Sequence, residues 1–512
     1  MKYCLSLLLI VHVLHCHLYA QVITYSPPLE DGVRYYNFVG KSHDSIITFN
    51  MKASGINEFT SQLYIYDNNL TLGQKIILPL PKKIFGIQFF MGSDFFYLFY
   101  QHQKGDSVYL DAAKLDIHGN LIGEIMELDK TYAFYAPKFD NKLYTIIISD
   151  NKKYILAFKI NNASGANTTI TTLLFNNNLQ LQHTSVLFAP LEDGVDYFTD
   201  FDVDNEGDLV FIRKNEAAGK LEMAKKTALV IKEAYSDSTQ VVGIIPGDVR
   251  VTDIHLKIDN LNKKYILAAF YSSNERLNID GLYCYVFNKA TRAAEVYRKI
   301  SFPDSLRKQA SQPGLLRKAF DNFSIQNIIL KYDGSFIIDA GSYSINPPSS
   351  YISPWDQLPY LGGGLPSGYI FYIPGARYPW STWSSFTSSV FSFSGDDIAV
   401  FSLDASASPE WIKFLDVSQF NAEQLFMGYT ANVLNNKIYY LYNQTEKNTS
   451  FLSAQLLDAG GNVNGTMFRD IDRTIQERIN FIPRSAVKIS DNELLMVCKK
   501  NARNYFAKIL FN

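Results

Sequence analysis

Carboxylates recur at alternate positions in one short stretch, and this is the pattern in the chain that comes closest to a metal site. The residues are Asp202, Asp204, Glu206 and Asp208. Alternating carboxylates can offer oxygen ligands to Ca²⁺. The EF-hand pattern fails, however, because Arg213 stands where that loop needs a bidentate glutamate. The stretch also occupies a position at which comparable segments of the chain carry a hairpin turn. We therefore interpret it as a turn, predict no metal, and keep calcium as the alternative.

Large aromatic side chains gather in one insertion, at about residues 344–389, which holds three of the four tryptophans. The binding candidates there are Trp355, Tyr360, Tyr378, Trp380 and Trp383. Frequent proline and glycine exclude a helix, and low charge with many aromatics argues against disorder. Rigid aromatic rings can stack on sugars or bury into a protein partner. The alternative is that the insertion packs its aromatics on the rest of the domain as a structural lid.

Signatures of catalysis are mostly absent. The chain has no Gly-x-Ser-x-Gly elbow, phosphate loop, dinucleotide fingerprint or His-Glu-x-x-His motif, so no catalytic residue is identified and no cofactor is predicted. The histidines that follow residue 20 are scattered singly: His43, His102, His118, His183 and His255. Asp396 and Asp397 are adjacent, but neighbours on a strand point to opposite faces, which argues against a glycosidase pair.

The first twenty residues have the pattern of a secretory signal. Lys2 precedes an apolar run from Leu5 to Leu14, and Ala20 offers a small residue for cleavage before Gln21. That run is too short to span a bilayer, and no later stretch reaches 18 apolar residues, so no transmembrane segment is predicted. We expect an exported protein, either periplasmic, at the cell surface or extracellular. Cys284 and Cys498 lie in apolar runs and are expected in the core, with one bridge between them as the alternative.

Internal repetition is the strongest signal for the fold. The hexapeptide Pro-Leu-Glu-Asp-Gly-Val occurs at Pro28–Val33 and at Pro190–Val195, 162 residues apart. The heptapeptide Asn-Lys-Lys-Tyr-Ile-Leu-Ala occurs at Asn151–Ala157 and at Asn262–Ala268, 111 residues apart. Both distances are close to multiples of about 55, a period typical of propellers and solenoids.

Each repeat reads as four strands, of which the second is very apolar and follows a turn rich in Asp, Asn and Gly. Eight such second strands are present: Ser45–Met51, Phe95–Tyr100, Tyr154–Ile160, Leu209–Ile212, Tyr265–Tyr271, Phe336–Ala340, Ile438–Tyr442 and Glu493–Cys498. The last repeat lacks a fourth strand, and Val22–Tyr25 is a strand without a repeat. We predict an all-β fold, a single propeller at residues 21–512 with eight four-stranded blades, closed by that N-terminal strand. Seven blades is the alternative. Ser305–Asp321 is expected to form a short basic helix or loop on the same side as the insertion.

The chain resembles the secreted β-propellers of Bacteroidetes-type bacteria. The segment Asp397–Asp404 followed by Glu410-Trp411-Ile412 carries this resemblance, which rests on period and turn pattern. The turn typical of sialidases and the tryptophan-docking repeat of quinoprotein dehydrogenases are absent. Most such propellers have no assigned activity, so the resemblance implies little about function.

The functional expectation is an exported, monomeric, non-enzymatic propeller that binds a glycan or an envelope protein through the aromatic insertion. A formal net charge of −2 argues against a nucleic-acid partner. One alternative is a hydrolase or lyase acting on polysaccharide, with its site at the mouth of the propeller channel. Another is a structural component of a cell-surface assembly.

Overall fold

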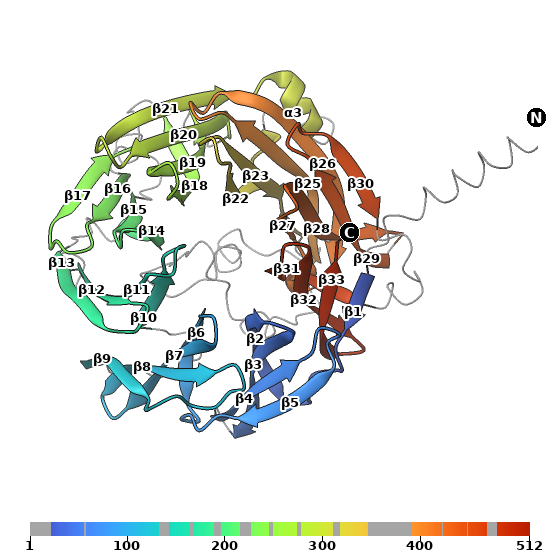
Figure 1. The fold of residues 1–512 in the computed structure, drawn as a ribbon. Coiled ribbons are helices and arrows are strands. Elements are labelled where there is room, and N and C mark those ends of the chain that lie inside the picture. The colour runs from blue at the N-terminus through green and yellow to red at the C-terminus, as the bar shows by residue number, and fades with distance from the viewer. Residues whose placement is uncertain are drawn as a thin grey trace, which may run out of the picture.

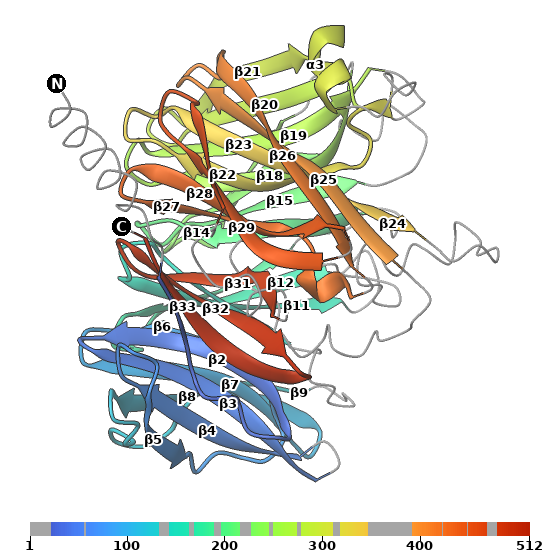
Figure 2. The same ribbon diagram turned by 90° about the vertical axis from the view of Figure 1, so that its right-hand side faces the viewer.

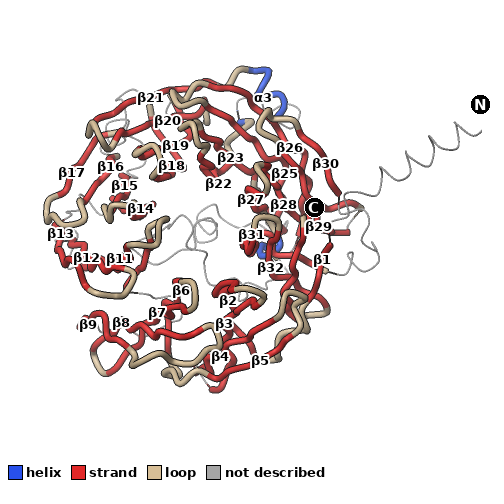
Figure 3. The backbone as a smooth tube through the Cα atoms, viewed as in Figure 1, coloured by secondary structure: helices blue, strands red, loops and turns tan. Residues whose placement is uncertain are grey.

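Eight antiparallel sheets are arranged as blades around a central axis in the computed structural model (Figure 1). The structure describes residues 22–55, 58–132, 143–162, 168–188, 196–215, 227–244, 249–273, 278–310, 318–346, 392–421, 423–447, 449–467 and 479–511. Within these ranges the chain is almost entirely strand and turn, as the tube in Figure 3 makes plain. No helix of the described residues is long and apolar enough to cross a membrane.

The first four blades follow the chain from its N-terminal side. Blade 1 consists of β2 (Val33–Ser42), β3 (Ser45–Gly55), β4 (Glu58–Tyr66) and β5 (Leu72–Ile77). Blade 2 consists of β6 (Ile84–Met91), β7 (Phe95–Lys104), β8 (Ser107–Asp116) and β9 (Met126–Tyr132). Blade 3 consists of β10 (Tyr144–Ile148), β11 (Tyr154–Asn162), β12 (Thr168–Asn176) and β13 (Leu181–Phe188). Blade 4 consists of β14 (Asp196–Val203), β15 (Leu209–Asn215), β16 (Ala228–Lys232) and β17 (Thr239–Gly243).

The remaining blades repeat this order. Blade 5 consists of β18 (Arg250–Asp259), β19 (Lys264–Ser272), β20 (Gly281–Asn288) and β21 (Ala293–Ser301). Blade 6 consists of β22 (Phe323–Leu330), β23 (Phe336–Ser342), β25 (Ser392–Leu403) and β26 (Pro409–Asn421), with the short β24 (Ser344–Asn346) beside β25. Blade 7 consists of β27 (Tyr429–Leu434), β28 (Lys437–Glu446), β29 (Thr449–Leu457) and β30 (Val463–Met467). Blade 8 consists of β31 (Asn480–Ser490), β32 (Glu493–Lys500), β33 (Arg503–Leu510) and β1 (Val22–Tyr25).

The ring closes through β1, which confirms the eight-blade prediction over the seven-blade alternative. β1 pairs antiparallel with β33, with Val22 opposite Leu510 and Tyr25 opposite Ala507. The first described strand therefore completes the sheet that the last strand leaves open. This pairing satisfies the edge of β33, which would otherwise be free to pair with another chain.

The second strand of each blade is apolar because both of its faces are covered. In β19, Tyr265 and Leu267 pack toward blade 4, whereas Ile266 and Ala268 pack toward blade 6. A strand buried on both faces shows a nearly continuous apolar run instead of an alternating pattern. This is why the second strands could be located from the sequence. Cys284 is buried in the core between blades 5 and 6, Cys498 in that between blades 7 and 8, and both are free thiols.

The two faces of the ring carry different connections. The turns between the first and second strands and between the third and fourth strands lie on one face. The connections between blades and between second and third strands lie on the other face, where Figure 2 places α3 (Asp304–Ala310) and β24. The helix confirms the expectation for the start of Ser305–Asp321. Asn346 pairs with Ser392, so the insertion leaves blade 6 on the same face as α3.

Candidate functional site: a pocket between blades 4 and 5

The turn between β14 and β15 is the local structure that the sequence predicted for the carboxylate string. Asp204 Oδ1 accepts hydrogen bonds from the backbone N–H groups of Glu206 at 2.9 Å and Asp208 at 3.0 Å. Gly207 has a φ of 91°, a left-handed conformation that glycine adopts without steric cost. The turn brings three carboxylates to the edge of blade 4 that faces blade 5.

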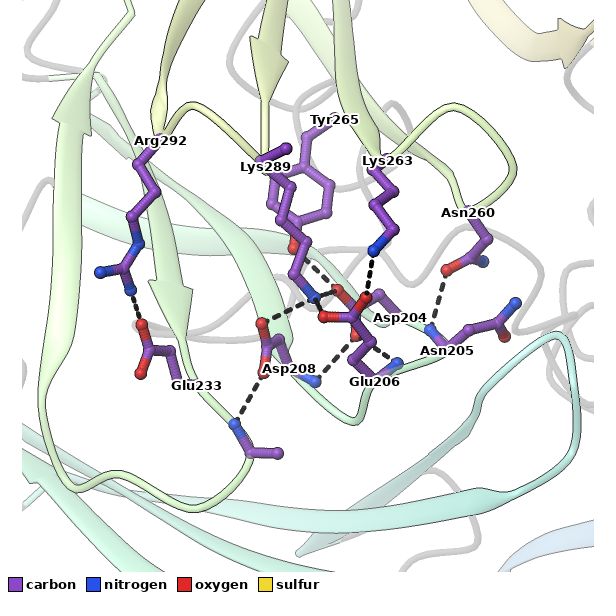
Figure 4. A network of polar contacts seen from close by, with 12 residues as sticks. Asp204, Asn205, Glu206, Asp208, Glu233, Asn260, Lys263, Tyr265, Lys289 and Arg292 are labelled. Atoms are coloured by element: carbon purple, nitrogen blue, oxygen red, sulfur yellow. Dashed lines mark hydrogen bonds and ion pairs between the residues drawn. The ribbon is translucent and has the colours of Figure 1, made fainter.

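A lysine from blade 5 reaches into these carboxylates (Figure 4). Lys289 lies in the turn between β20 and β21, and its Nζ contacts Glu206 Oε2 at 2.8 Å, Asp208 Oδ2 at 2.9 Å and the Oδ2 atom of Asp204. Three of the four calcium candidates thus surround an ammonium group. Asp202 does not contact Lys289. Its carboxylate instead accepts a hydrogen bond from the N–H of Val203. No group of His, Cys, Asp and Glu in the described ranges could hold a metal ion.

Charge pairing sets the protonation states in this cluster. Burial lowers the pKa of Lys289, but its hydrogen bonds to the three carboxylates outweigh burial and raise it above the usual range. The pKa of Glu206 is lowered, chiefly by Lys289 and then by Lys263, whose Nζ lies 3.2 Å away. Tyr265 donates its hydroxyl to Asp204 Oδ2 at 2.8 Å, and burial, followed by Asp204, raises its pKa. Lys289 and Glu206 are therefore held charged at neutral pH.

A cavity of about 430 Å³ borders this cluster, between the turns of blades 4 and 5. Its lining combines charged and aromatic side chains, including Glu206, Asp208, Glu233, Tyr235, Lys289 and Arg292. This volume falls within the range of about 300–1,000 Å³ typical of small-molecule sites. These six residues come from the turns between first and second or between third and fourth strands, so the pocket lies on the face opposite α3 and the roots of the insertion.

The rim of the pocket is exposed and crosses the joint between the two blades. Arg292 from blade 5 forms an ion pair with Glu233 from blade 4, and their side chains are 63% and 45% exposed (Figure 4). Tyr235 is 58% exposed. The centroid of its ring lies 6.4 Å from that of His183 in an edge-to-face arrangement, so Tyr235 also packs against blade 3. An exposed aromatic ring, a cation and an anion thus line the same cavity.

The aromatic residues singled out from the sequence lie outside the described residues. These are Trp355, Tyr360, Tyr378, Trp380 and Trp383. Their proposed binding role and the alternative of a packed lid therefore both stay predictions.

The histidines do not converge on one site, but His255 has a specific environment. Its Nδ1 lies 3.3 Å from Asp200 Oδ1, and its Nε2 lies 3.1 Å from Asp253 Oδ1. Asp200 and Asp253 sit at bulges in the innermost strands β14 and β18, with φ values of 54° and 53°. Burial lowers the pKa of His255, but Asp253 and Asp200 outweigh it and raise the pKa well above 6.5. The ring is therefore a positively charged link between blades and not a free base.

Sequence reasoning missed this cluster and one other feature of the same kind. Asp200 and His255 are 55 residues apart, one repeat period, so only the fold brings them together. At Asp396-Asp397 a bulge interrupts the expected alternation, and Asp397 has a φ of 50°. Burial, followed by the charges of Asp416 and Asp396, raises the pKa of Asp397 to about 6. The alternation rule therefore does not separate these two side chains as the sequence suggested.

Comparisons with known proteins give no family for this chain. No protein-family model matches it, and no curated protein matches it in sequence. Among solved structures, a prolyl endopeptidase aligns at 10% identity and a TM-score of 0.41, covering 92% of this chain and 55% of that chain. This chain thus spans about half the length of that enzyme. An ulvan lyase of polysaccharide lyase family PL25 aligns at 11% identity and a TM-score of 0.37, covering 82% and 90% of the two chains. Such low scores carry no argument about function.

Proposed function

We propose that this protein is an exported β-propeller that binds a saccharide in the pocket between blades 4 and 5. The observation that carries the proposal is Tyr235, 58% exposed beside a cavity of about 430 Å³ whose rim also presents Arg292 and Glu233. A sugar ring has apolar C–H faces that stack on aromatic rings, and its hydroxyl groups both donate and accept hydrogen bonds. Hydrogen bonds to charged partners are stronger than those between neutral groups.

Binding without catalysis fits the charges of this pocket better than hydrolysis does. General acid–base chemistry needs a group whose pKa lies near the working pH. Here the pKa of Glu206 is lowered and that of Lys289 is raised, so both groups are held in their charged forms. Their ion pairs hold the floor of the pocket in one arrangement, which favours binding of a ligand of fixed shape.

Export and the aromatic insertion complete the proposal. The N-terminal segment with Lys2 and the apolar run Leu5–Leu14 supports export. The insertion leaves blade 6 on the face opposite the pocket, and we propose it as a second binding segment for a larger glycan or a protein partner of the envelope. Trp355, Trp380 and Trp383 would provide its aromatic contacts.

The test is a glycan-array screen of residues 21–512, followed by calorimetric titration of the best saccharide. Tyr235→Ala should weaken binding about tenfold or more, because losing an aromatic anchor commonly costs 1.4 kcal/mol or more. Tyr332→Ala is the matched control, since Tyr332 is 90% exposed in the turn between β22 and β23 and does not line the pocket. It should leave the affinity unchanged.

Three other results would change the proposal. Binding that survives in Tyr235→Ala but is lost in a Trp355, Trp380 and Trp383 triple alanine variant would move the site to the insertion. Shortened saccharides after incubation would show a hydrolase or lyase. Absence of binding to every saccharide would overturn glycan recognition, and capture of an envelope protein by the wild type alone would then favour a protein partner.

A further inference from the structure

A carboxyl group lies fully buried in the joint between blades 6 and 7. Asp339 is on β23, and its side chain has no exposed surface. Two residues earlier on the same strand, Ile337 packs in the apolar cluster of this joint together with Val400 and Tyr440. The pleat of β23 directs Asp339 to the same side as Ile337, so the carboxyl occupies a position at which an apolar side chain would be expected.

Neutral donors from three strands surround this carboxyl. Tyr429 on β27 donates its hydroxyl to Oδ1 at 2.5 Å, and Tyr440 on β28 lies 3.5 Å from Oδ2. Asn327 on β22 places its Nδ2 2.9 Å from Oδ1 and 3.1 Å from Oδ2. Among the described residues, no cation lies within ion-pair distance of Asp339. The carboxyl therefore connects two blades through hydrogen bonds alone.

The protonation state of such a group depends on the balance between burial and these donors. Burial disfavours the charged form and raises the pKa of Asp339 to about 7, although the hydrogen bonds from Tyr429, Asn327 and Tyr440 act in the opposite direction. The other titratable groups that face it are the two tyrosines, whose pKa values lie well above 10, and Arg484 of blade 8, whose charge acts on Tyr429. The two tyrosines stay neutral around neutral pH.

We propose that Asp339 is a proton-sensitive clamp that holds blades 6 and 7 together while its carboxyl is neutral and weakens when the carboxyl ionises. An ionised carboxylate without a counterion in an apolar joint is unfavourable, and opening the joint to water relieves this cost. The clamp is independent of the saccharide pocket between blades 4 and 5.

The direction of the pH effect follows from the two states of the chain. In the unfolded chain an aspartate ionises near its ordinary pKa of about 3.9. Between about pH 4 and about pH 7 the unfolded chain releases this proton while the folded protein retains it. The contribution of Asp339 to stability is therefore full below about pH 4, declines up to about pH 7 and is constant above that.

The experiment compares urea unfolding of the wild type with that of Asp339→Asn from about pH 4 to about pH 8.5. The asparagine keeps the size and some of the hydrogen bonds but does not titrate, so other groups cancel in the difference between the two midpoints. The midpoint of the wild type minus that of Asp339→Asn should fall as the pH rises to about 7 and then level off. A difference that is constant or rises with pH would overturn the clamp.

Two further measurements guard against a variant that does not fold. Tyr429→Phe removes one hydrogen-bond donor to the ionised carboxyl and should therefore raise the pKa of Asp339 further. The decline in stability with rising pH should then extend to higher pH in this variant than in the wild type. In the wild type itself, amide exchange of β27, corrected for its intrinsic pH dependence, should accelerate from about pH 4 to about pH 7 relative to that of β19 and then level off. Equal acceleration of both strands would show that the joint does not open locally and would contradict the proposal.

Discussion

At the scale of single residues, charged groups in this protein link neighbouring blades. Lys289 of blade 5 forms ion pairs with Asp204, Glu206 and Asp208 of blade 4, and His255 lies between the carboxylates of Asp200 and Asp253. The side chains of Lys289 and His255 are only 17% and 16% exposed. A buried charge is tolerated only when it is paired, so removing one partner leaves the other without compensation.

Replacing Lys289 tests this at the floor of the pocket. Lys289→Met keeps most of the aliphatic stem but removes the ammonium, and it should lower the free energy of unfolding at pH 7 by about 3 kcal/mol. Part of the loss should be recovered in acid, where the freed carboxylates take up protons. The measurement is urea unfolding at pH 7 and again in acid. Lys263→Met is the matched control, because Lys263 is 60% exposed and such pairs contribute less than about 1 kcal/mol. Equal losses in the two variants would contradict this account.

At the scale of elements, the same five-residue turn recurs around the ring. An Asp or Asn side chain accepts hydrogen bonds from the backbone N–H groups two and four residues later, and the fourth residue is left-handed. These turns begin at Asp67, Asp116, Asn176, Asp204, Asp404 and Asp458. The first turns of successive blades also meet, since Asn205 accepts from the N–H of Asn151 and Asn260 accepts from that of Asn205. The repeat of the sequence is thus a repeat of turn chemistry.

Two glycines in blade 2 allow the cost of a left-handed backbone to be measured apart from the cost of overpacking. Gly119 has a φ of 79°, and a Cβ there would lie 2.6 Å from Ile76 Cδ1. Gly123 has a φ of 75°, but a Cβ there would meet nothing within 4 Å. Gly123→Ala should cost about 1–2 kcal/mol from the left-handed backbone alone. Gly119→Ala should cost a further 1–3 kcal/mol or so from overpacking, measured by thermal unfolding. Equal costs would show that the side chain of Ile76 moves away freely.

At the scale of the whole molecule, stability depends on joining the two ends of the chain. Besides the pairing of β1 with β33, Glu493 of blade 8 contacts Lys41 of blade 1 at 2.7 Å and Lys508 of its own blade at 3.0 Å. All three side chains are at least four-fifths buried. Burial raises the pKa of Glu493, but the hydrogen bonds from Lys41, Lys508 and Ser490 outweigh it and lower the pKa to about 2.

Glu493→Gln should weaken this closure. Because the folded pKa of Glu493 lies below the unfolded value of about 4.3, its contribution is present above about pH 4.5 and is lost as the pH falls toward 2. The variant should lose about 3 kcal/mol at pH 7, and its difference from the wild type should shrink in acid, as measured by urea unfolding. Glu295→Gln is the control, since Glu295 is 39% exposed beside Lys264 and should change little. A loss that persists unchanged at about pH 2 would point to packing instead of charge.

The sequence by itself determined the architecture of this protein. Apolar second strands such as Tyr265–Tyr271, and the turns that precede them, can be recognised because a strand covered on both faces must be apolar and a tight turn needs particular residues. The same local rules identified Val22–Tyr25 as the strand that closes the ring. They also identified the segment Asp204–Asp208 as a turn.

Only the tertiary structure decided which side chains meet. Lys289 and Asp204 are 85 residues apart, Asp339 and Tyr429 are 90 apart, and none of these residues carries a local pattern that announces its partner. Contacts between blades depend on bulges, such as those at Asp200 and Asp253, and on the angle at which each sheet packs on the next. Local sequence preferences fix the form of each blade. The positions of charges and cavities between blades follow from the closure of the whole ring.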